Sequence, residues 1–281
     1  MLKIGIVLNY MNFEQTIECV ESLLNSGMDR VIVVDNASTN GSFETIREKF
    51  KEKRNVDAIS VSENQGYACG NNVGLRYAEK YMSPDNIIFI VNPDSRICAD
   101  SLNKISDVIL KNPDIGAVTG LVNGSNKSVW HHMTAFSSFI YNSWVLKWVL
   151  LKFQHREGGY YPNVSDDIQE VDVVSGALFG ISQAHFKKIN YFDEGTFLYY
   201  EEEALYCRLA NTNLQNVLLN NASYKHLGRG STSMSKLSFK KINDESRMYV
   251  LRTYYHVSRK YILTTLLIDR LDNWFLKVLK R

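Results

Sequence analysis

The first 122 residues alternate between short apolar segments and amphipathic segments, and this alternation restricts the fold more than any other feature of the chain. The apolar segments KIGIVLNY, RVIVVDNAS and NIIFIVNPDS predict strands that are buried on both faces of a sheet. Between them, apolar residues recur at intervals of three or four, as in FEQTIECVESLLNSG, which predicts helices. We therefore expect an α/β fold with a mostly parallel central sheet flanked by helices.

The alternation becomes irregular after residue 122 and later resumes, which predicts how the chain is divided. Residues 1–122 and 123–235 would be two halves of one α/β domain, with the irregular stretch between about 123 and 170. Residues 236–281 have helical spacing and are rich in Lys, Arg and aromatic residues. They predict a helical C-terminal extension.

Composition argues against several classes of function. With 281 residues, 45% hydrophobic and 22% charged, we expect a soluble globular protein with a large core. A net charge of +2 gives no general basic field, so we expect no nucleic-acid partner. We expect neither a signal peptide nor a membrane-spanning helix, which needs roughly 20 apolar residues. The cysteines form no CxxC pair and are expected to be reduced, buried thiols of a cytoplasmic protein. They are Cys19, Cys69, Cys98 and Cys207.

Polar side chains follow several predicted strands at the point where each strand ends. Asn9, Asp35, Asn64 and Asn92 occupy such positions, and ligands of parallel sheets bind beyond the carboxyl ends of the strands. Asp35 could accept hydrogen bonds from a ribose hydroxyl or a base N–H. It could equally cap a helix or form an Asx turn, and the residues alone leave both interpretations open.

Three further residues could contribute to a site at this edge. Gly66 lies in the glycine-rich segment NQGYACGNNVG, which could let a phosphate approach the backbone but is more often only a turn. Asp94 in NPDS could hold Mg²⁺ or Mn²⁺ if phosphate oxygens supply the other ligands, or it could belong to a simple turn. His226 in YKHLGRGS could be a metal or phosphate ligand, or a structural residue.

Three adjacent glutamates follow an apolar and aromatic run in FLYYEEEALYCRL. If residues 198–209 form a helix, Glu202 lies on the same stripe as the leucines of this segment and points toward the protein body. Glu201 would flank that stripe, and Glu203 would face the solvent. A helix start exposed to solvent would explain the position of Glu203 but not that of Glu202. We therefore expect Glu202 to be a proton acceptor at the edge of a pocket.

Taken together, these motifs resemble the family 2 glycosyltransferases, especially their rhamnosyltransferase-like branch. That family shows Asn-Tyr-Asn after a first strand, then Asp-Asn-Ala-Ser, Asn-x-Gly, Asn-Pro-Asp, Val-Ser-Gly-Ala, Phe-Asp-Glu, a Glu-Asp pair and His-x-Gly. The corresponding segments here are NYM, DNASTNGS, NQGYACGNN, NPDS, VSGALFGIS, YFDE, FLYYEEEAL and HLGRGS. Each motif is weak alone, but the set occurs in unbroken order over roughly residues 1–232.

The resemblance implies a GT-A fold in which residues 1–122 bind the nucleotide and residues 123–235 bind the acceptor. The residues placed at the nucleotide are Asn9, Asp35, Asn64, Gly66 and Asn92. The residues placed at the pocket for the acceptor or donor sugar are Gly176, Ala177 and Tyr199. Asp94 would be the metal-binding aspartate, with His226 beside it near the diphosphate and Mg²⁺ or Mn²⁺ as the cofactor. Glu202 stands at the position of the catalytic base and Glu201 at that of its partner.

The resemblance further implies inverting transfer of a sugar from a UDP- or dTDP-linked donor to a hydroxyl of a glycan or lipid-linked saccharide, in cell-surface polysaccharide synthesis. The chain departs from the family at three positions. The family has Asp where this chain has Glu202, a second Asp where it has Ala204, and usually Trp where it has Val173. One alternative is a non-catalytic sugar-nucleotide-binding or assembly subunit. A less favoured one is a nucleotidyltransferase, which would need a glycine-rich, basic loop that NYMNFEQT does not provide.

The C-terminal segment SRKYILTTLLIDRLDNWFLKVLKR combines apolar residues near helical spacing with several basic residues, among them Lys260 and Arg270. A basic amphipathic helix that contains Trp suits the surface of an anionic membrane. The segment FIYNSWVLKWVLLKF, with Trp144 and Trp148, could form a second such surface. Either segment could instead be a core element or a homodimer interface. With the family context, we expect peripheral association with the inner face of the cell membrane.

Overall fold

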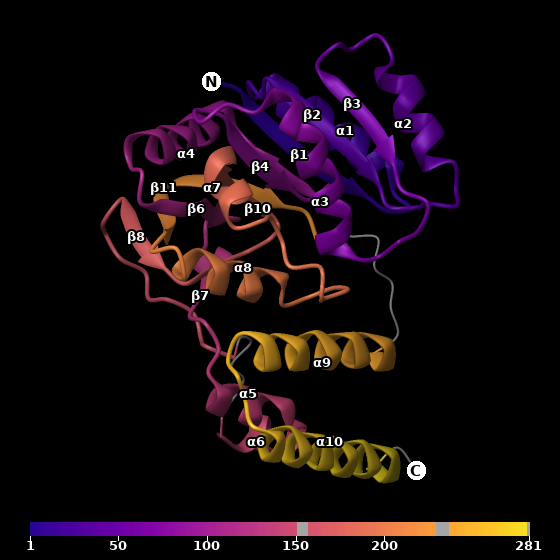
Figure 1. Ribbon diagram of the computed structural model, residues 1–281, viewed down its shortest axis with the longest axis vertical. Coiled ribbons are helices and arrows are strands. Elements are labelled where there is room, and N and C mark those ends of the chain that lie inside the picture. Colours follow the sequence, from indigo (N-terminus) through magenta and orange to yellow (C-terminus); the bar gives the residue numbers. More distant parts are fainter. Residues whose placement is uncertain (151–156, 229–235, 280–281) are drawn as a thin grey trace.

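The computed structural model describes residues 1–150, 157–228 and 236–279. Within these residues, a sheet of 9 strands carries helices on both faces and is followed by two long C-terminal helices (Figure 1). The strand order is β3-β2-β1-β4-β10-β6-β11-β5, and β8 pairs with β11. The strands of this sheet are β1 (Lys3–Asn9), β2 (Arg30–Asp35), β3 (Val56–Ser60), β4 (Ile87–Val91), β5 (Ser95–Ile97), β6 (Ile115–Val122), β8 (Ile168–Val171), β10 (Leu178–Ser182) and β11 (Gln215–His226). A separate pair is formed by β7 (Val129–Trp130) and β9 (Val173–Val174).

Four neighbouring strands, β3, β2, β1 and β4, run parallel to one another, as the alternation predicts. Their side chains enter two cores, one on each face of the sheet. Ile4 and Ile6 pack on the face covered by α3, whereas Val7 packs on the face covered by α1, α2 and α4. The helices are α1 (Phe13–Asn25), α2 (Ser42–Phe50), α3 (Tyr67–Ala78) and α4 (Ala99–Lys111). Burial on both faces explains why these strands are apolar throughout.

The second half of the sheet is mixed. Strand β10 lies between β4 and β6 and runs antiparallel to both, while β6 and β11 are parallel. Since β10 runs against β4, the residues just before β10 lie beside the end of β4, and the Asn92 N–H donates to the Ala177 carbonyl over 2.9 Å. The predicted α/β architecture is confirmed, and β10 adds a segment from the second half to the polar edge of the first.

The C-terminal helices form layers on the side of the molecule away from β1–β4 (Figure 1). Helix α9 (Lys236–Thr253) lies below α8 (Glu201–Ala210), and α10 (Arg259–Leu279) packs against α5 (Ala135–Asn142) next to α6 (Trp144–Leu150). The Tyr261 hydroxyl donates to the Ala135 carbonyl over 2.7 Å, and Ser246 Oγ donates to the Leu198 carbonyl over 2.9 Å. These bonds attach the helical extension to the middle of the chain. One short helix, α7 (Gln183–Lys188), follows β10.

Two predictions about burial and membranes can be compared with this fold. All four cysteines are free, but only Cys19 is buried; Cys98 is exposed, so the prediction of uniformly buried thiols is wrong. Cys98 directly precedes α4, at the surface end of that helix. No helix in the described part of the chain is long and apolar enough to span a bilayer. Trp144 and Trp148, named above for a second membrane surface, have side chains that lie outside the described residues.

Candidate active site

A cavity of about 1170 Å³ opens at the carboxyl ends of β1, β2 and β4, where the sequence places its polar residues. It continues between α8 and α9 and reaches α5 and α6. Of the predicted site residues, those that line it are Asn64, Gly66, Asn92, Asp94, Gly176, Ala177, Tyr199, Glu201, Glu202 and His226. The fold therefore brings most of the motifs together from segments up to about 160 residues apart in the sequence.

Asn9 and Asp35 do not line the cavity but lie beneath it, at 0% and 2% exposure. Asn9 Nδ2 donates to Asp35 Oδ2 over 2.6 Å, and the Ser38 N–H donates to Asp35 Oδ1 over 2.9 Å. Thr16 Oγ1 in turn donates to Asn9 Oδ1 over 2.7 Å. A buried carboxylate needs such partners, so this pair fixes the ends of β1 and β2.

Asn36, the residue after the Asp35 strand end, connects β2 to the glycine-rich turn. Its Nδ2 donates to Asn64 Oδ1 over 2.9 Å and to the Gly66 carbonyl over 3.2 Å. Gly66 has φ = +100°, and a Cβ at this position would lie 2.1 Å from the Phe197 carbonyl oxygen. The Tyr67 N–H donates to that same oxygen over 2.8 Å. Glycine is therefore required here by both the backbone conformation and the contact with the segment before α8.

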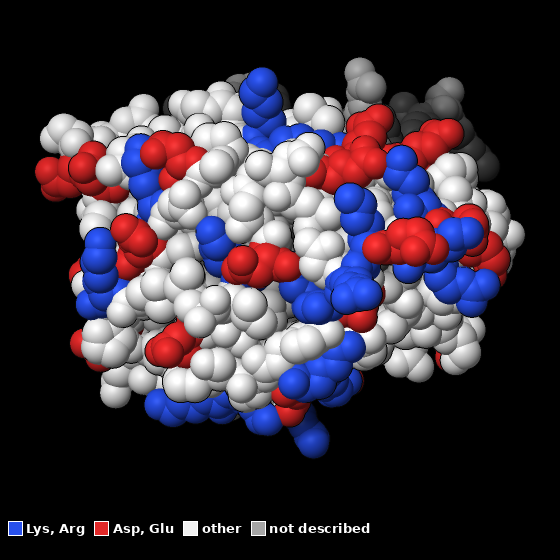
Figure 2. Space-filling model, turned by 90° about the horizontal axis from the view of Figure 1, so that it is seen from above, with Lys and Arg blue, Asp and Glu red and all other residues white. Residues whose placement is uncertain are grey.

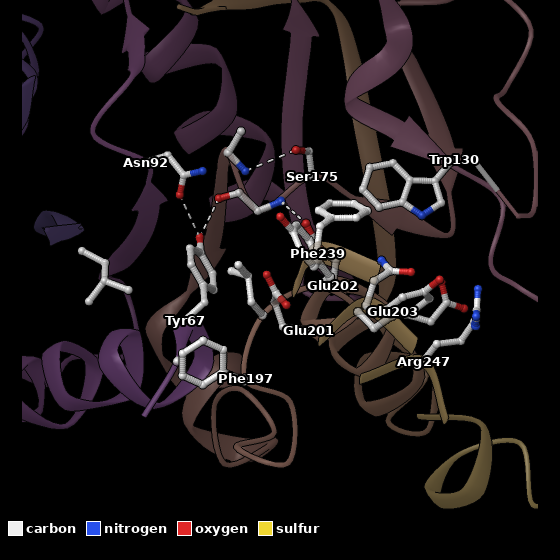
Figure 3. Close-up of a pocket in the computed structure, with 18 of the residues that line it drawn as sticks. Tyr67, Asn92, Trp130, Ser175, Phe197, Glu201, Glu202, Glu203, Phe239 and Arg247 are labelled. Carbon is white, nitrogen blue, oxygen red and sulfur yellow. Dashed lines mark hydrogen bonds between the residues drawn. The ribbon is translucent and has the colours of Figure 1, made fainter. Parts of the chain in front are cut away.

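Tyr67 connects the two halves of the site, as Figure 3 shows. Its hydroxyl lies 3.1 Å from Asn92 Oδ1 and 2.8 Å from the Gly176 carbonyl, so it can donate to either oxygen. The N–H of the same residue, Gly176, donates to Glu202 Oε1 over 3.2 Å. Burial and the nearby charges of Glu201 and Glu202 raise the pKa of Tyr67 well above its usual range, so it stays a hydrogen-bond donor.

The three glutamates occupy the first turn of α8, where the helix dipole favours negative charge. The helix begins at Glu201 and not at residue 198, because Tyr199 and Tyr200 have φ values of +70° and +67°. Glu202 lies at the cavity wall but is only half-buried, and the glutamates on either side of it, Glu201 and Glu203, are buried, so the predicted stripe does not describe this turn. The carboxylates of Glu201 and Glu202 reach the cavity from a rigid element.

The prediction that Glu203 faces the solvent is wrong. Glu203 is 4% exposed, and it accepts hydrogen bonds from the Met133 N–H at 2.8 Å and the Tyr255 hydroxyl at 2.5 Å. Burial raises the pKa of Glu203 to about 7. The cause lies far away in the sequence: Tyr255 follows α9, and this layer covers the side of α8 that a lone amphipathic helix would expose.

Asp94 and His226 meet at one end of the cavity, because β5 pairs with the end of β11. Asp94 Oδ2 lies 3.1 Å from His226 Nε2, and this hydrogen bond raises the pKa of the imidazole. A carboxylate and an imidazole are both acceptable ligands for Mn²⁺ and, less readily for the imidazole, for Mg²⁺. Among the described residues no three His, Cys, Asp or Glu side chains form a metal cage. The pair therefore fits a divalent cation whose other ligands are phosphate oxygens or water.

The far end of the cavity also includes residues outside the quoted motifs, among them Glu157 and Arg247. Arg247 of α9 is buried, lies 3.2 Å from Glu157 Oε1 and also contacts Asp244 and Asn142. The Tyr200 hydroxyl donates to the same Glu157 oxygen over 2.6 Å. Near the entrance, the rings of Tyr199 and Phe239 lie 5.0 Å apart. The C-terminal extension thus contributes directly to the cavity wall.

The comparisons with known proteins agree with this architecture. A crystal structure of GalNAc-T7 with UDP, GalNAc and Mn²⁺ matches with a TM-score of 0.68 at 10% identity, covering 92% of this chain and 49% of that one. The S. aureus protein TarS, crystallised with UDP-GlcNAc, matches with a TM-score of 0.55 at 18% identity, covering 89% of this chain and 67% of that one. These likenesses confirm the predicted GT-A type of fold.

Sequence comparison gives the family. The hexosyltransferase Agl10 of low-salt glycan biosynthesis in Haloferax volcanii is 24% identical over 197 residues, which are 70% of this chain and 58% of Agl10. The chain thus spans a little over half the length of this curated relative and about half the length of GalNAc-T7. The family model described as glycosyl transferase family 2 matches residues 6–189, which is more than half of the chain. The protein therefore belongs to glycosyl transferase family 2.

Proposed function

We propose that this protein is an inverting hexosyltransferase that moves a sugar from a nucleoside-diphosphate donor to a hydroxyl group of a saccharide. The observation that carries the proposal is the position of Glu202, whose carboxylate is fixed by the Gly176 N–H in the same cavity as Asn92 and Asp94. Agl10 is a hexosyltransferase, and GalNAc-T7 and TarS were crystallised with UDP or UDP-GlcNAc. UDP-sugars are accordingly the donors we favour, and dTDP-sugars, which the family resemblance also implies, are the second class.

The donor nucleotide would bind at the ends of β1 and β2. Asn64 and Gly66 line the cavity there, within reach of a nucleotide bound at these strand ends. We assign Asn9 and Asp35 an indirect part, because both are buried and hydrogen-bonded to each other. They would hold the strand ends that the nucleotide contacts. This assignment refines the expectation of direct contact and keeps residues 1–122 as the nucleotide-binding half.

The diphosphate would lie near Asn92, Asp94 and His226. When bound there, Mg²⁺ or Mn²⁺ held by Asp94 and His226 would neutralise the charge that develops on the leaving diphosphate. Asn92 is oriented by its bond with Tyr67 and can donate through its amide nitrogen. Because the leaving group is already a good one, no carboxylic acid is needed to protonate it.

Glu202 would act as the general base. It takes the proton of the acceptor hydroxyl as that oxygen attacks the anomeric carbon, and the bond from this carbon to the diphosphate oxygen breaks. Attack from the side opposite to the leaving group inverts the configuration, through a transition state like that of glycoside hydrolysis. Glu201, buried beside it, would set the local charge and orientation. Gly176 and Ala177 would form the floor under the reacting sugar.

The acceptor would enter between α8 and α9, over Tyr199. The deep end of the cavity is polar, and within the described residues Glu157 Oε2 accepts no hydrogen bond. Sugar hydroxyls are suitable donors for such an oxygen. A saccharide or a lipid-linked saccharide of a cell-surface polysaccharide is the acceptor class we favour, with residues 123–235 and the extension 236–281 forming its site.

The proposal is tested by incubating the full chain with UDP- and dTDP-sugars, Mn²⁺ or Mg²⁺ and candidate saccharides. dTDP-rhamnose belongs in the set because of the resemblance to the rhamnosyltransferase-like branch. Release of nucleoside diphosphate that depends on the acceptor is expected. A non-catalytic subunit would bind donors, seen as a rise in melting temperature, without turnover. A nucleotidyltransferase would instead release pyrophosphate from a nucleoside triphosphate and a sugar phosphate, and either result would contradict the proposal.

A further inference from the structure

Helix α10 exposes one face over the part in which its side chains are described. Among the described side chains from Arg259 to Trp274, those exposed are five apolar, three basic and one threonine. They are Leu263, Leu266, Leu267, Leu271 and Trp274; Arg259, Lys260 and Arg270; and Thr264. We call this set the α10 face. Leu263 and Trp274 are 67% and 64% exposed, so most of their apolar surface contacts solvent in the isolated chain.

Acidic residues are absent from the α10 face, because the fold turns both acids of this stretch inward. Asp272 is buried and accepts a hydrogen bond from Ser143 Oγ over 3.3 Å. Asp269 lies 3.2 Å from Lys240 of α9. Thr265 is buried as well, and its carbonyl accepts a hydrogen bond from Asn142 Nδ2 over 3.4 Å. These contacts fix the rotation of α10, so the exposed face exists before any partner binds.

The charge pattern of the α10 face differs from that of the opposite end of the molecule. Figure 2 looks onto the molecule from the end opposite to α10, and there basic and acidic side chains are interspersed. Several exposed basic residues of that α/β part form ion pairs, such as Lys104 with Asp100 at 2.8 Å. In contrast, Arg259, Lys260 and Arg270 pair with no Asp or Glu side chain in the described ranges. Their charge is available to an anionic partner.

The chemistry of this face distinguishes between two occupants. In a symmetric dimer the same patch meets itself, which would oppose three cations to three cations. At an anionic bilayer, the leucines and Trp274 enter the headgroup region while Arg and Lys extend toward the phosphates. We propose that the α10 face binds the surface of an anionic lipid bilayer, with the helix lying in the interfacial plane. This inference goes beyond the proposed function and does not depend on it.

The proposal also gives the cavity an orientation. Tyr141 and Asn142 of α5 line the deep part of the cavity, and Asn142 is bonded to α10. Phe136 of α5 and Val149 and Leu150 of α6 are exposed in the same layer. A chain docked through α10 would thus hold the cavity at a fixed distance from the lipid surface.

Vesicle flotation of the full chain tests the proposal, with vesicles of phosphatidylcholine alone or mixed equally with phosphatidylglycerol. Binding to the mixed vesicles is expected at low salt and should weaken at high salt, because the attraction is screened. Equal binding to neutral vesicles, or no flotation with either kind, would overturn the proposal. This comparison uses the unmodified protein and so does not depend on the folding of any variant.

Two sets of variants test the face itself. R259Q/K260Q/R270Q should lower the partition coefficient of the protein between mixed vesicles and water by about a hundredfold. The matched control K51Q/K53Q/R54Q, at exposed positions next to α2, should leave this coefficient unchanged. L267E/L271E should abolish flotation, whereas M82E/L110E, at exposed positions of the α/β part, should not. Unaltered flotation of either α10 variant would exclude the α10 face. If light scattering instead shows a dimer that L267E/L271E dissociates, the occupant is a second copy and the proposal fails.

Discussion

The backbone N–H of Gly176 donates to Glu202 Oε1 over 3.2 Å, and this bond joins the segment just before β10 to the first turn of α8. A Cβ on residue 176 would lie 3.2 Å from the same oxygen and 3.3 Å from the Tyr67 hydroxyl, so the contact is close on both sides. Glu202 thus presents one oxygen to the backbone, and no hydrogen bond from the described residues reaches the other, which can serve a ligand in the cavity. A fixed carboxylate with one free oxygen suits a general base.

Glu202→Gln tests this role. The variant keeps the side-chain shape and an oxygen for the Gly176 N–H but cannot accept a proton at neutral pH. Turnover should fall at least ~10²-fold while donor affinity changes little. The measurement is steady-state release of nucleoside diphosphate together with donor titration, and Glu52→Gln at an exposed position is the matched control. Full activity of Glu202→Gln would exclude Glu202 as the base.

Glu202→Asp provides a second comparison, because the family pattern has Asp at this position. The variant remains a carboxylate but is shorter by one methylene, so it should lose contact with the Gly176 N–H. We expect turnover between that of the unmodified chain and that of Glu202→Gln. Activity equal to that of Glu202→Gln would mean that position, more than basicity, limits the reaction.

Asp94→Asn tests the cation site. Removing one anionic ligand should weaken donor binding by at least about tenfold when Mn²⁺ is present and should change it little in EDTA. Isothermal titration with UDP in both conditions measures the difference. Asp85→Asn, at an exposed position before β4, is the control. Donor binding and transfer that survive thorough chelation would count against a metal at Asp94 and His226.

The sequence predicts the polar edge of the site well but not its walls. Strand ends such as Asn64 and Asn92 can be located because apolar runs stop there, and parallel strands end at one edge. The direction of β10 is not encoded locally, since an apolar run fits a parallel or an antiparallel neighbour equally well. Arg247 and Tyr255 could not be predicted at the site, because their placement depends on how a distant helical layer folds back over α8. Non-local packing also reversed the expected exposure of Glu203.

Gly66→Ala tests the link between the glycine-rich turn and the segment before α8. An alanine at φ = +100° costs about 1–3 kcal/mol of unfolding free energy, and its Cβ would also collide with the Phe197 carbonyl. Gly41→Ala is a suitable control, because Gly41 has φ = +75° but no atom within 4 Å of the added Cβ. We expect Gly66→Ala to be the more destabilised in urea unfolding and to bind the donor more weakly. Equal destabilisation of the two variants would show that the Phe197 contact matters little.

Glu203→Gln tests the buried carboxyl group through the pH dependence of stability. The pKa of Glu203 rises from 4.5 in the unfolded chain to about 7 in the fold, so between these pH values the folded protein holds a proton that the unfolded chain has lost. The raised pKa of Glu203 therefore stabilises the fold fully below pH 4.5. This stabilisation is lost as the pH rises to 7, which lowers the unfolding free energy by about 3 kcal/mol in total. Glu203→Gln cannot ionise and still offers an oxygen to the Met133 N–H or the Tyr255 hydroxyl, so this decline should disappear. Urea unfolding across this pH range measures it, with Glu245→Gln on the exposed side of α9 as the control that keeps the slope. If Glu203→Gln and the unmodified chain lose stability in parallel as the pH rises, then Glu203 is ionised throughout this range. The hydrogen bonds from Met133 and Tyr255 would then lower the pKa of Glu203 more than burial raises it.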